Sequence, residues 1–326
     1  MQPTPLYTDQ FDTFARGETP EMREIGEGMF SVPVPFGDAF VRYTLTYVFL
    51  DANGDAHVLD PGAGTEQNFE ILSHALDSVG AGVHRVASIT ITHLHVDHFG
   101  GAARLARASG APVVAHPAEI DAIVTDARSL AEAQQLDGWG VPADRWAAAV
   151  GPSRPPLGDV ADLTFLAAGD VLQIPGRRLV PVHTPGHTTG HLCIDAPDEG
   201  LLFTGDHVLP VTRPGFALGA APSGNGLVDY LNSLDLVARL DRDTVHPAHE
   251  YSFAGLAERC AALTQHHLTR ADEVAAVLQT DPDATVWEVA SQVRWTVGWE
   301  NLAGYHLRLA LLQTACHVDR LRAPAT

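Results

Sequence analysis

The chain has 326 residues, with 40 Asp and Glu against 20 Lys and Arg, and a formal net charge of −20. All 20 basic residues are arginine, which excludes a Schiff-base lysine, a P-loop lysine and a Ser–Lys nucleophile pair. The acidity counts against a nucleic-acid-binding track, because phosphate binding needs a dense positive stripe. The 17 histidines point instead to metal binding or acid–base chemistry.

Apolar runs and cysteine content also indicate the cellular compartment. The longest apolar runs are too short to span a bilayer, and residues 1–5 do not begin a signal peptide. The three cysteines are far apart and lack a C-x-x-C spacing, as expected of buried thiols in a reducing compartment; they are Cys193, Cys260 and Cys316. We therefore expect a soluble cytoplasmic protein without membrane association.

Strand and helix patterns alternate over most of the chain. Residues 1–27 are polar, lack strong periodicity and are interpreted as an N-terminal arm. Apolar spacing predicts helices over 66–79, 101–108 and 227–240. Runs rich in β-branched and aromatic residues predict strands at 29–34, 40–50, 56–59, 86–91, 112–115, 163–166, 179–182, 191–194, 201–203 and 244–245. This alternation favours a layered α/β architecture.

Two regions are predicted to be helical. An Ala-rich stretch at about 117–156 is interpreted as a helical insertion within a catalytic domain over 28–252. Beyond it, a C-terminal module over 253–326 contains amphipathic helices at 253–279 and 303–322. Between these helices, Thr285 and Glu288 have the spacing of a capping box. The apolar stripe of 302–321 fits either an intramolecular core or a homo-oligomer seam.

The clearest motif is T-H-L-H-V-D-H-F-G-G at residues 92–101, directly after a predicted buried strand. Residues two apart in an extended segment face the same side, so His93 and His95 can bind one ion. Asp97 and His98 fall where the next helix begins and can turn toward a second ion. Such a density of potential ligands predicts a metal site.

Further His and Asp residues stand where other predicted strands end. Loops held by a rigid sheet give the precision that metal geometry requires. Imidazole and carboxylate donors without thiolate suit zinc, and also iron, manganese or cobalt. The set is too rich for one tetrahedral ion and suits two ions that share a bridging carboxylate. The segments concerned are residues 58–62, 182–191, 202–207 and 245–250.

These segments, in this order, resemble the metallo-β-lactamase-fold hydrolases, especially the glyoxalase II-like small-molecule hydrolases. The resemblance covers roughly residues 28–250 and implies an α/β fold, a four-layer αββα sandwich with the site at one edge. It implies that Asp60 orients the ligands from outside the donor set. His207 lies beside these motifs and either packs or hydrogen-bonds to a ligand there, or contacts substrate. The implied ligands are His93, His95 and His187 for the first metal and Asp97, His98 and His249 for the second, with Asp206 bridging.

Two departures from related families narrow the function. Zinc β-lactamases usually lack an acid at the position of Asp206 and are exported, which counts against antibiotic hydrolysis. Flavodiiron-type oxidases carry Glu at the position of His95 and an added flavin domain, which counts against redox chemistry.

We therefore predict a dinuclear metal-dependent hydrolase that attacks a small ester, thioester or lactone with a metal-bound hydroxide. Two divalent ions are expected, Zn²⁺ before iron or manganese. Asp97 and Asp206 are the catalytic candidates for moving the proton to the leaving group. The alternatives are a phosphodiesterase or nuclease of the same fold, which the net charge disfavours, and a non-catalytic metal-binding member.

The substrate-binding segments are predicted from their position. The Gly- and Pro-rich stretch 208–226 directly follows Asp206 and is interpreted as a substrate loop. Its Arg213, Phe216 and Leu218 are candidates to contact a carboxylate or an acyl chain. The helical insertion is expected to form the other wall of the pocket.

Overall fold

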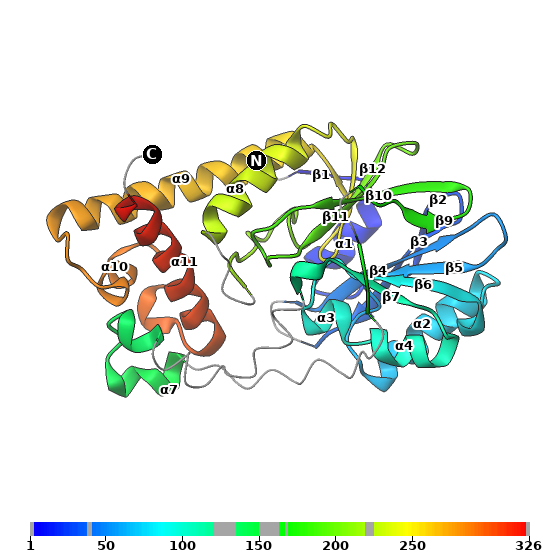
Figure 1. Ribbon diagram of the computed structural model, residues 1–326, viewed down its shortest axis with the longest axis horizontal. Coiled ribbons are helices and arrows are strands. Elements are labelled where there is room, and N and C mark those ends of the chain that lie inside the picture. Colours follow the sequence, from blue (N-terminus) through cyan, green and yellow to red (C-terminus); the bar gives the residue numbers. More distant parts are fainter. Residues whose placement is uncertain are drawn as a thin grey trace.

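The computed structural model describes residues 3–37, 41–119, 135–149, 163–166, 169–218 and 225–323. Two seven-stranded sheets pack face to face, and helices cover their outer faces (Figure 1). This arrangement confirms the predicted αββα sandwich. Residues 120–134 and 150–156 of the predicted insertion, and 219–224 of the predicted substrate loop, lie outside the described residues.

The first sheet has the order β2-β3-β4-β5-β6-β7-β8. Its pairs are antiparallel from β2 to β5 and parallel from β5 to β8. The strands are β2 (Arg23–Gly26), β3 (Met29–Pro35), β4 (Tyr43–Leu50), β5 (Ala56–Leu59), β6 (Val86–Thr90), β7 (Val113–Ala115) and β8 (Leu163–Phe165). On its outer face lie α2 (Glu66–Ser78) and α4 (Ala102–Ser109), with the short η1 (Val83–Arg85) between them in sequence.

The second sheet has the order β1-β14-β13-β12-β11-β10-β9. Its strands are β1 (Thr4–Pro5), β9 (Leu172–Ile174), β10 (Arg177–His183), β11 (Leu192–Ala196), β12 (Leu201–Gly205), β13 (Thr244–Pro247) and β14 (Phe253–Ala254). Its outer face packs against α8 (Gly226–Ala238) and the start of α9 (Leu256–Thr280). The three-residue strand β9 was not predicted.

Side chains that alternate along the strands build the core between the sheets. Leu45, Tyr47 and Phe49 of β4 point inward and meet Phe203 of β12 and Leu179 of β10. Because helices cover the outer faces, both faces of β4 and β12 are buried. This packing holds the strand ends rigidly at the edge where the predicted ligands lie.

The segment predicted as an N-terminal arm contributes a strand to each sheet. Strand β1 pairs with β14, and β2 pairs with β3. Between them, α1 (Thr8–Ala15) places Phe11 and Phe14 against the ring of Tyr251, at centroid distances of 5.1 and 5.5 Å. The polar sequence concealed this role, because both strands are short and lie at sheet edges.

A helical region lies at one end of the molecule (Figure 1). Its C-terminal helices are α9, α10 (Val286–Gln292) and α11 (Gly304–Arg322), which confirm the predicted long helices. Thr285 and Glu288 form the predicted capping box at the start of α10. The remaining short helices of the described residues are α3 (Val96–Phe99), η2 (Pro117–Glu119), η3 (Ala143–Arg145), α7 (Trp146–Ala149) and η4 (Trp299–Asn301).

Residues 135–149 of the predicted insertion pack onto α10 and α11. Leu136, Val141 and Ala149 share a buried cluster with residues of these helices. The backbone N–H of Trp287 donates to the backbone carbonyl of Trp139 at 2.9 Å. All five tryptophans of the chain lie in this region. The helical region is therefore assembled from two parts of the chain that are far apart in sequence. Among the described helices, none is long and apolar enough to cross a membrane.

Candidate metal centre

The structure brings all seven predicted metal ligands together at one edge of the sandwich. Within the first sheet β5 and β6 run parallel, and within the second β10, β12 and β13 share one direction, so the turns that follow these strands meet at this edge. The ligands stand on the turns that follow. His93 and His95 follow β6, Asp97 and His98 lie in α3, and His187, Asp206 and His249 follow β10, β12 and β13.

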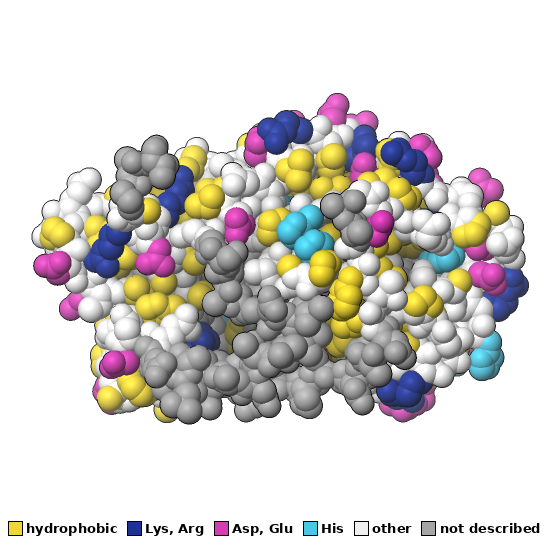
Figure 2. Space-filling model, viewed as in Figure 1, with side chains coloured by type: hydrophobic (Ala, Val, Ile, Leu, Met, Phe, Trp, Pro, Cys, Tyr) yellow, Lys and Arg dark blue, Asp and Glu magenta, His cyan; other side chains and the backbone are white. Residues whose placement is uncertain are grey.

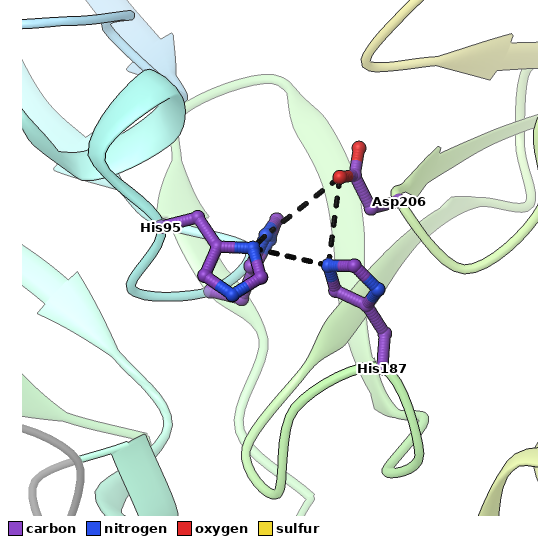
Figure 3. A group of neighbouring side chains, drawn as sticks. His95, His187 and Asp206 are labelled. Atoms are coloured by element: carbon purple, nitrogen blue, oxygen red, sulfur yellow. Dashed lines mark hydrogen bonds and ion pairs between the residues drawn. The ribbon is translucent and has the colours of Figure 1, made fainter. Parts of the chain in front are cut away.

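The first donor group consists of His93, His95, His187 and one oxygen of Asp206. His95 Nδ1 lies 2.8 Å from His93 Nε2 and 3.1 Å from His187 Nε2. Asp206 Oδ2 lies 3.5 Å from His187 Nε2 and 3.9 Å from His93 Nε2. Figure 3 shows His95, His187 and Asp206 turned toward one another from separate loops. This convergence of three imidazoles and a carboxylate matches the ligands that a Zn²⁺ ion takes.

The second donor group consists of Asp97, His98 and His249, and the other oxygen of Asp206 faces it. Asp97 Oδ2 lies 3.6 Å from His98 Nε2 and 3.4 Å from His249 Nε2. Asp206 Oδ1 lies 3.5 Å from His98 Nε2 and 3.0 Å from His249 Nε2. The two carboxylate oxygens of Asp206 thus face different groups, as a bridging ligand would.

Unsatisfied buried atoms show that these residues fit cations. The Nε2 atoms of His98 and His249 and Oδ1 of Asp206 are buried, and the ion-pair contacts among them do not have hydrogen-bond geometry. Such atoms are costly to bury without a partner. Divalent ions held between the two groups would satisfy them, and the donor set suits zinc, iron or manganese.

The two donor groups differ in their electrostatics. Burial lowers the pKa of His93 and His187, which keeps these imidazoles neutral, the form that binds metal. Burial also opposes charge on His249, but the carboxylates of Asp206 and Asp97 raise its pKa to about 10. In the chain by itself, a proton on the second group therefore balances the carboxylates, and a cation would take its place.

Hydrogen bonds from residues outside the donor groups orient the ligand atoms. Asp60 accepts hydrogen bonds from the Thr92 amide at 2.8 Å and the Thr92 hydroxyl at 2.7 Å, and Asp60 Oδ2 lies 2.8 Å from His98 Nδ1. The Nδ1 atoms of His249 and His187 lie 2.9 and 2.7 Å from the carbonyls of Tyr43 and Gly215. In each histidine, Nδ1 is engaged and Nε2 is left facing the site. Asp60 lies where the resemblance places an orienting acid.

Two other histidines, His191 and His207, are neighbours of Asp206. His191, which is fully buried, accepts the Asp206 backbone N–H at Nε2 over 3.1 Å. His207 is also fully buried, with its ring edge-on to Tyr230 at 5.0 Å. A substrate contact by His207 is therefore disfavoured, because packing separates its ring from solvent.

The three residues singled out in the predicted substrate loop differ in their burial. Phe216 and Leu218 are buried, and Phe216 packs in the core beside Tyr230. Arg213 is exposed. Sequence alone could not make this distinction, because all three lie in a stretch without periodicity. Of the three, only Arg213 offers its side chain to a substrate in solution.

Two buried charged residues hold this loop in place. The carboxylate of Glu250 accepts hydrogen bonds from the backbone N–H groups of Val211 and Thr212, at 2.6 and 2.8 Å. The Arg259 guanidinium donates to the carbonyls of Leu209, Val211 and Thr212. Glu250 follows His249 directly, so the loop is tied to the second donor group.

Comparison with known proteins bears on the family and the fold. The model of the metallo-beta-lactamase superfamily matches residues 40–249. The human protein named acyl-coenzyme A thioesterase MBLAC2 is 26% identical over 263 residues, which cover 76% of this chain and 87% of that protein. Thioesterase pkgB of Emericella nidulans is 26% identical and covers 84% of this chain and 67% of that protein. Lactamase-like protein aptB, also of Emericella nidulans, is 32% identical, but only 34% of this chain and 33% of that protein are aligned.

Solved structures extend the similarity to nearly the whole chain. The metallo-beta-lactamase family protein TTHA1429 from Thermus thermophilus superposes with a TM-score of 0.72 at 27% identity and covers 92% of this chain and 94% of that one. A beta-lactamase domain protein from Burkholderia ambifaria has a TM-score of 0.71 and covers 92% of this chain and 88% of that one; at 22% identity it shows the fold alone. From its sequence match, its sandwich and its converging donors, the chain belongs to the metallo-β-lactamase superfamily.

Proposed function

We propose that the protein is a dinuclear metal-dependent hydrolase that cleaves a small thioester. The observation that carries this proposal is the position of Asp206, whose two oxygens face two separate donor groups. The names of two relatives, both thioesterases, favour a thioester over the ester and lactone that the sequence left open.

The chain's own residues have definable tasks in such a reaction. The seven donors would hold two divalent ions, which would supply a hydroxide nucleophile at neutral pH and polarise the substrate carbonyl. Asp60 fixes the orientation of His98. We assign the movement of the proton to the leaving group to Asp97 or Asp206. Of the three substrate classes, a thioester needs the least protonation of its leaving group. A thiol has an ordinary pKa of about 8.5 and therefore leaves readily as a thiolate.

The alternative of a phosphodiesterase or nuclease is disfavoured by charge. A net charge of −20 repels a polyanion. On the face in Figure 2, the dark-blue arginine side chains are scattered and form no continuous stripe over the described residues. The complete donor set also fits a non-catalytic metal-binding member, and the substrate panel below separates that alternative from a hydrolase.

The test is elemental analysis of the purified protein together with a substrate panel. We expect two metal ions per chain and faster hydrolysis of acyl thioesters than of lactones, aryl esters or bis-p-nitrophenyl phosphate. Preferred cleavage of the phosphate diester, or salt-sensitive binding of RNA, would favour the nuclease alternative. A metal-loaded protein that cleaves none of these compounds would favour the non-catalytic one.

Arg213 supports a substrate that carries a negative charge. Arg213 is exposed and lies in the loop that Glu250, the residue after His249, holds through the backbone N–H groups of Val211 and Thr212. Arg270, whose charge acts with that of Arg213 to lower the pKa of His266 after burial, already pairs with Glu273 at 2.9 Å. An anionic group of the substrate would therefore pair with Arg213.

We predict that Arg213→Gln raises KM for an acyl-coenzyme A by roughly 10-fold, the loss expected for a hydrogen bond to a charged group. KM for the same acyl group on N-acetylcysteamine, which is neutral, should not change. Arg239→Gln is the matched control, because it removes an exposed arginine that pairs with Asp235 on α8. Equal effects of Arg213→Gln on both thioesters would contradict the assignment.

A further inference from the structure

A buried carboxylate joins the two loops that carry the first donor group. Glu119, the last residue of η2, is only 2% exposed. Its Oε2 accepts the Leu94 N–H at 2.9 Å, and its Oε1 accepts the Gly190 N–H at 2.6 Å. Leu94 stands between His93 and His95, and Gly190 follows His187 by three residues. One side chain thus binds the backbone of both ligand loops.

The loop around Gly190 closes directly onto Glu119. A Cβ atom at Gly190 would lie 2.7 Å from Glu119 Cγ and 2.8 Å from the Glu119 backbone nitrogen, so a larger residue does not fit. Beside it, the Thr189 hydroxyl donates to the Ala118 carbonyl at 3.0 Å. The end of η2 and the loop after β10 are therefore held together on both sides of the Gly190 amide.

A carboxylate is the side chain that this position requires. Both buried N–H groups need an acceptor, and Glu119 supplies one oxygen to each. Glutamine has the same length but replaces one acceptor by a donor, so one N–H would lose its partner. Aspartate keeps both oxygens but is one methylene shorter. The sequence offered no signal for this role, because Glu119 lies within a stretch that was interpreted as helical.

We propose that Glu119 is a positioning residue, which sets the separation of His95 and His187 and thereby the affinity of the first donor group for its metal ion. The two ligand nitrogens lie 3.1 Å apart, and each belongs to a loop that Glu119 holds. Residues that orient metal ligands typically account for 10- to 100-fold in metal affinity. The inference rests on the proposed metal site and is independent of the substrate.

The test measures Zn²⁺ affinity of the full chain by competition with a chromophoric chelator. Glu119→Gln is combined with His249→Ala, which leaves the first donor group intact, and separately with His187→Ala, which leaves the second. We expect Glu119→Gln to weaken Zn²⁺ binding 10- to 100-fold in the first background and less than about 3-fold in the second. Glu119→Asp should behave in the same way and serves if the glutamine variant does not fold.

Asp195→Asn is the matched control. Asp195 is also a buried carboxylate, but it lies on β11 away from the donor groups and pairs with Arg242 at 2.7 Å. This variant should lower the melting temperature without changing Zn²⁺ affinity. Equal weakening in both backgrounds, or native affinity with only a lower melting temperature, would make Glu119 merely structural and overturn the proposal. Failure of the native chain to bind Zn²⁺ would instead refute the metal site itself.

Discussion

Replacing Asp206 by alanine should reduce kcat/KM for a thioester by roughly 10³-fold or more. Asp206 faces both donor groups, so its loss removes a ligand from each and the group that joins them. Metal ions contribute several kcal/mol to transition-state stabilisation, and each 1.36 kcal/mol corresponds to about tenfold in rate. The measurement is steady-state kinetics with metal analysis of the same preparation, which should fall below two ions per chain.

Two comparisons make this result specific. Asp97→Ala should remove the ion of the second group and retain that of the first, because Asp97 faces only His98 and His249. Asp195→Asn, a buried carboxylate at the other end of the sheet, should keep native activity and both ions. Circular dichroism would establish that each variant is folded. Full activity of Asp97→Ala or Asp206→Ala in a folded protein would be incompatible with the proposed dinuclear centre.

Exhaustive chelation should abolish hydrolysis, and Zn²⁺ or Mn²⁺ should restore it. Without ions, the buried ligand nitrogens of His98 and His249 are left with ion-pair contacts to the carboxylates of Asp97 and Asp206, which lack hydrogen-bond geometry. Metal should therefore also stabilise the fold. An ion at 100 times its dissociation constant contributes about 2.7 kcal/mol, which raises the melting temperature by roughly 5 °C in a chain of this size.

Two probes separate local from global effects of metal removal. All five tryptophans lie in the helical region, so their fluorescence reports on that region, whereas circular dichroism reports on the whole chain. We expect chelation to lower the melting temperature measured by circular dichroism. Hydrolysis that survives complete removal of metal, verified by elemental analysis, would refute the proposed mechanism.

Local sequence was sufficient to predict those features of the structure that depend on residues close together in the chain. The extended segment at His93 and His95 and the helix start at Asp97 and His98 set the side-chain directions within a few residues. The capping box of Thr285 was predictable for the same reason, since its hydrogen bonds close within one helical turn. The assignment of all seven donors to two groups came from the family resemblance, and the fold brings the strand ends that carry them to one edge.

Contacts between distant segments required the tertiary structure. Glu119 meets Leu94 and Gly190 across 25 and 71 residues, and no pattern in its own neighbourhood marks it. The same holds for Arg213, which is exposed while Phe216 beside it is buried. It holds also for residues 135–149, whose partners are α10 and α11. Periodicity encodes which face of an element is apolar, but only the folded chain decides which other element covers it.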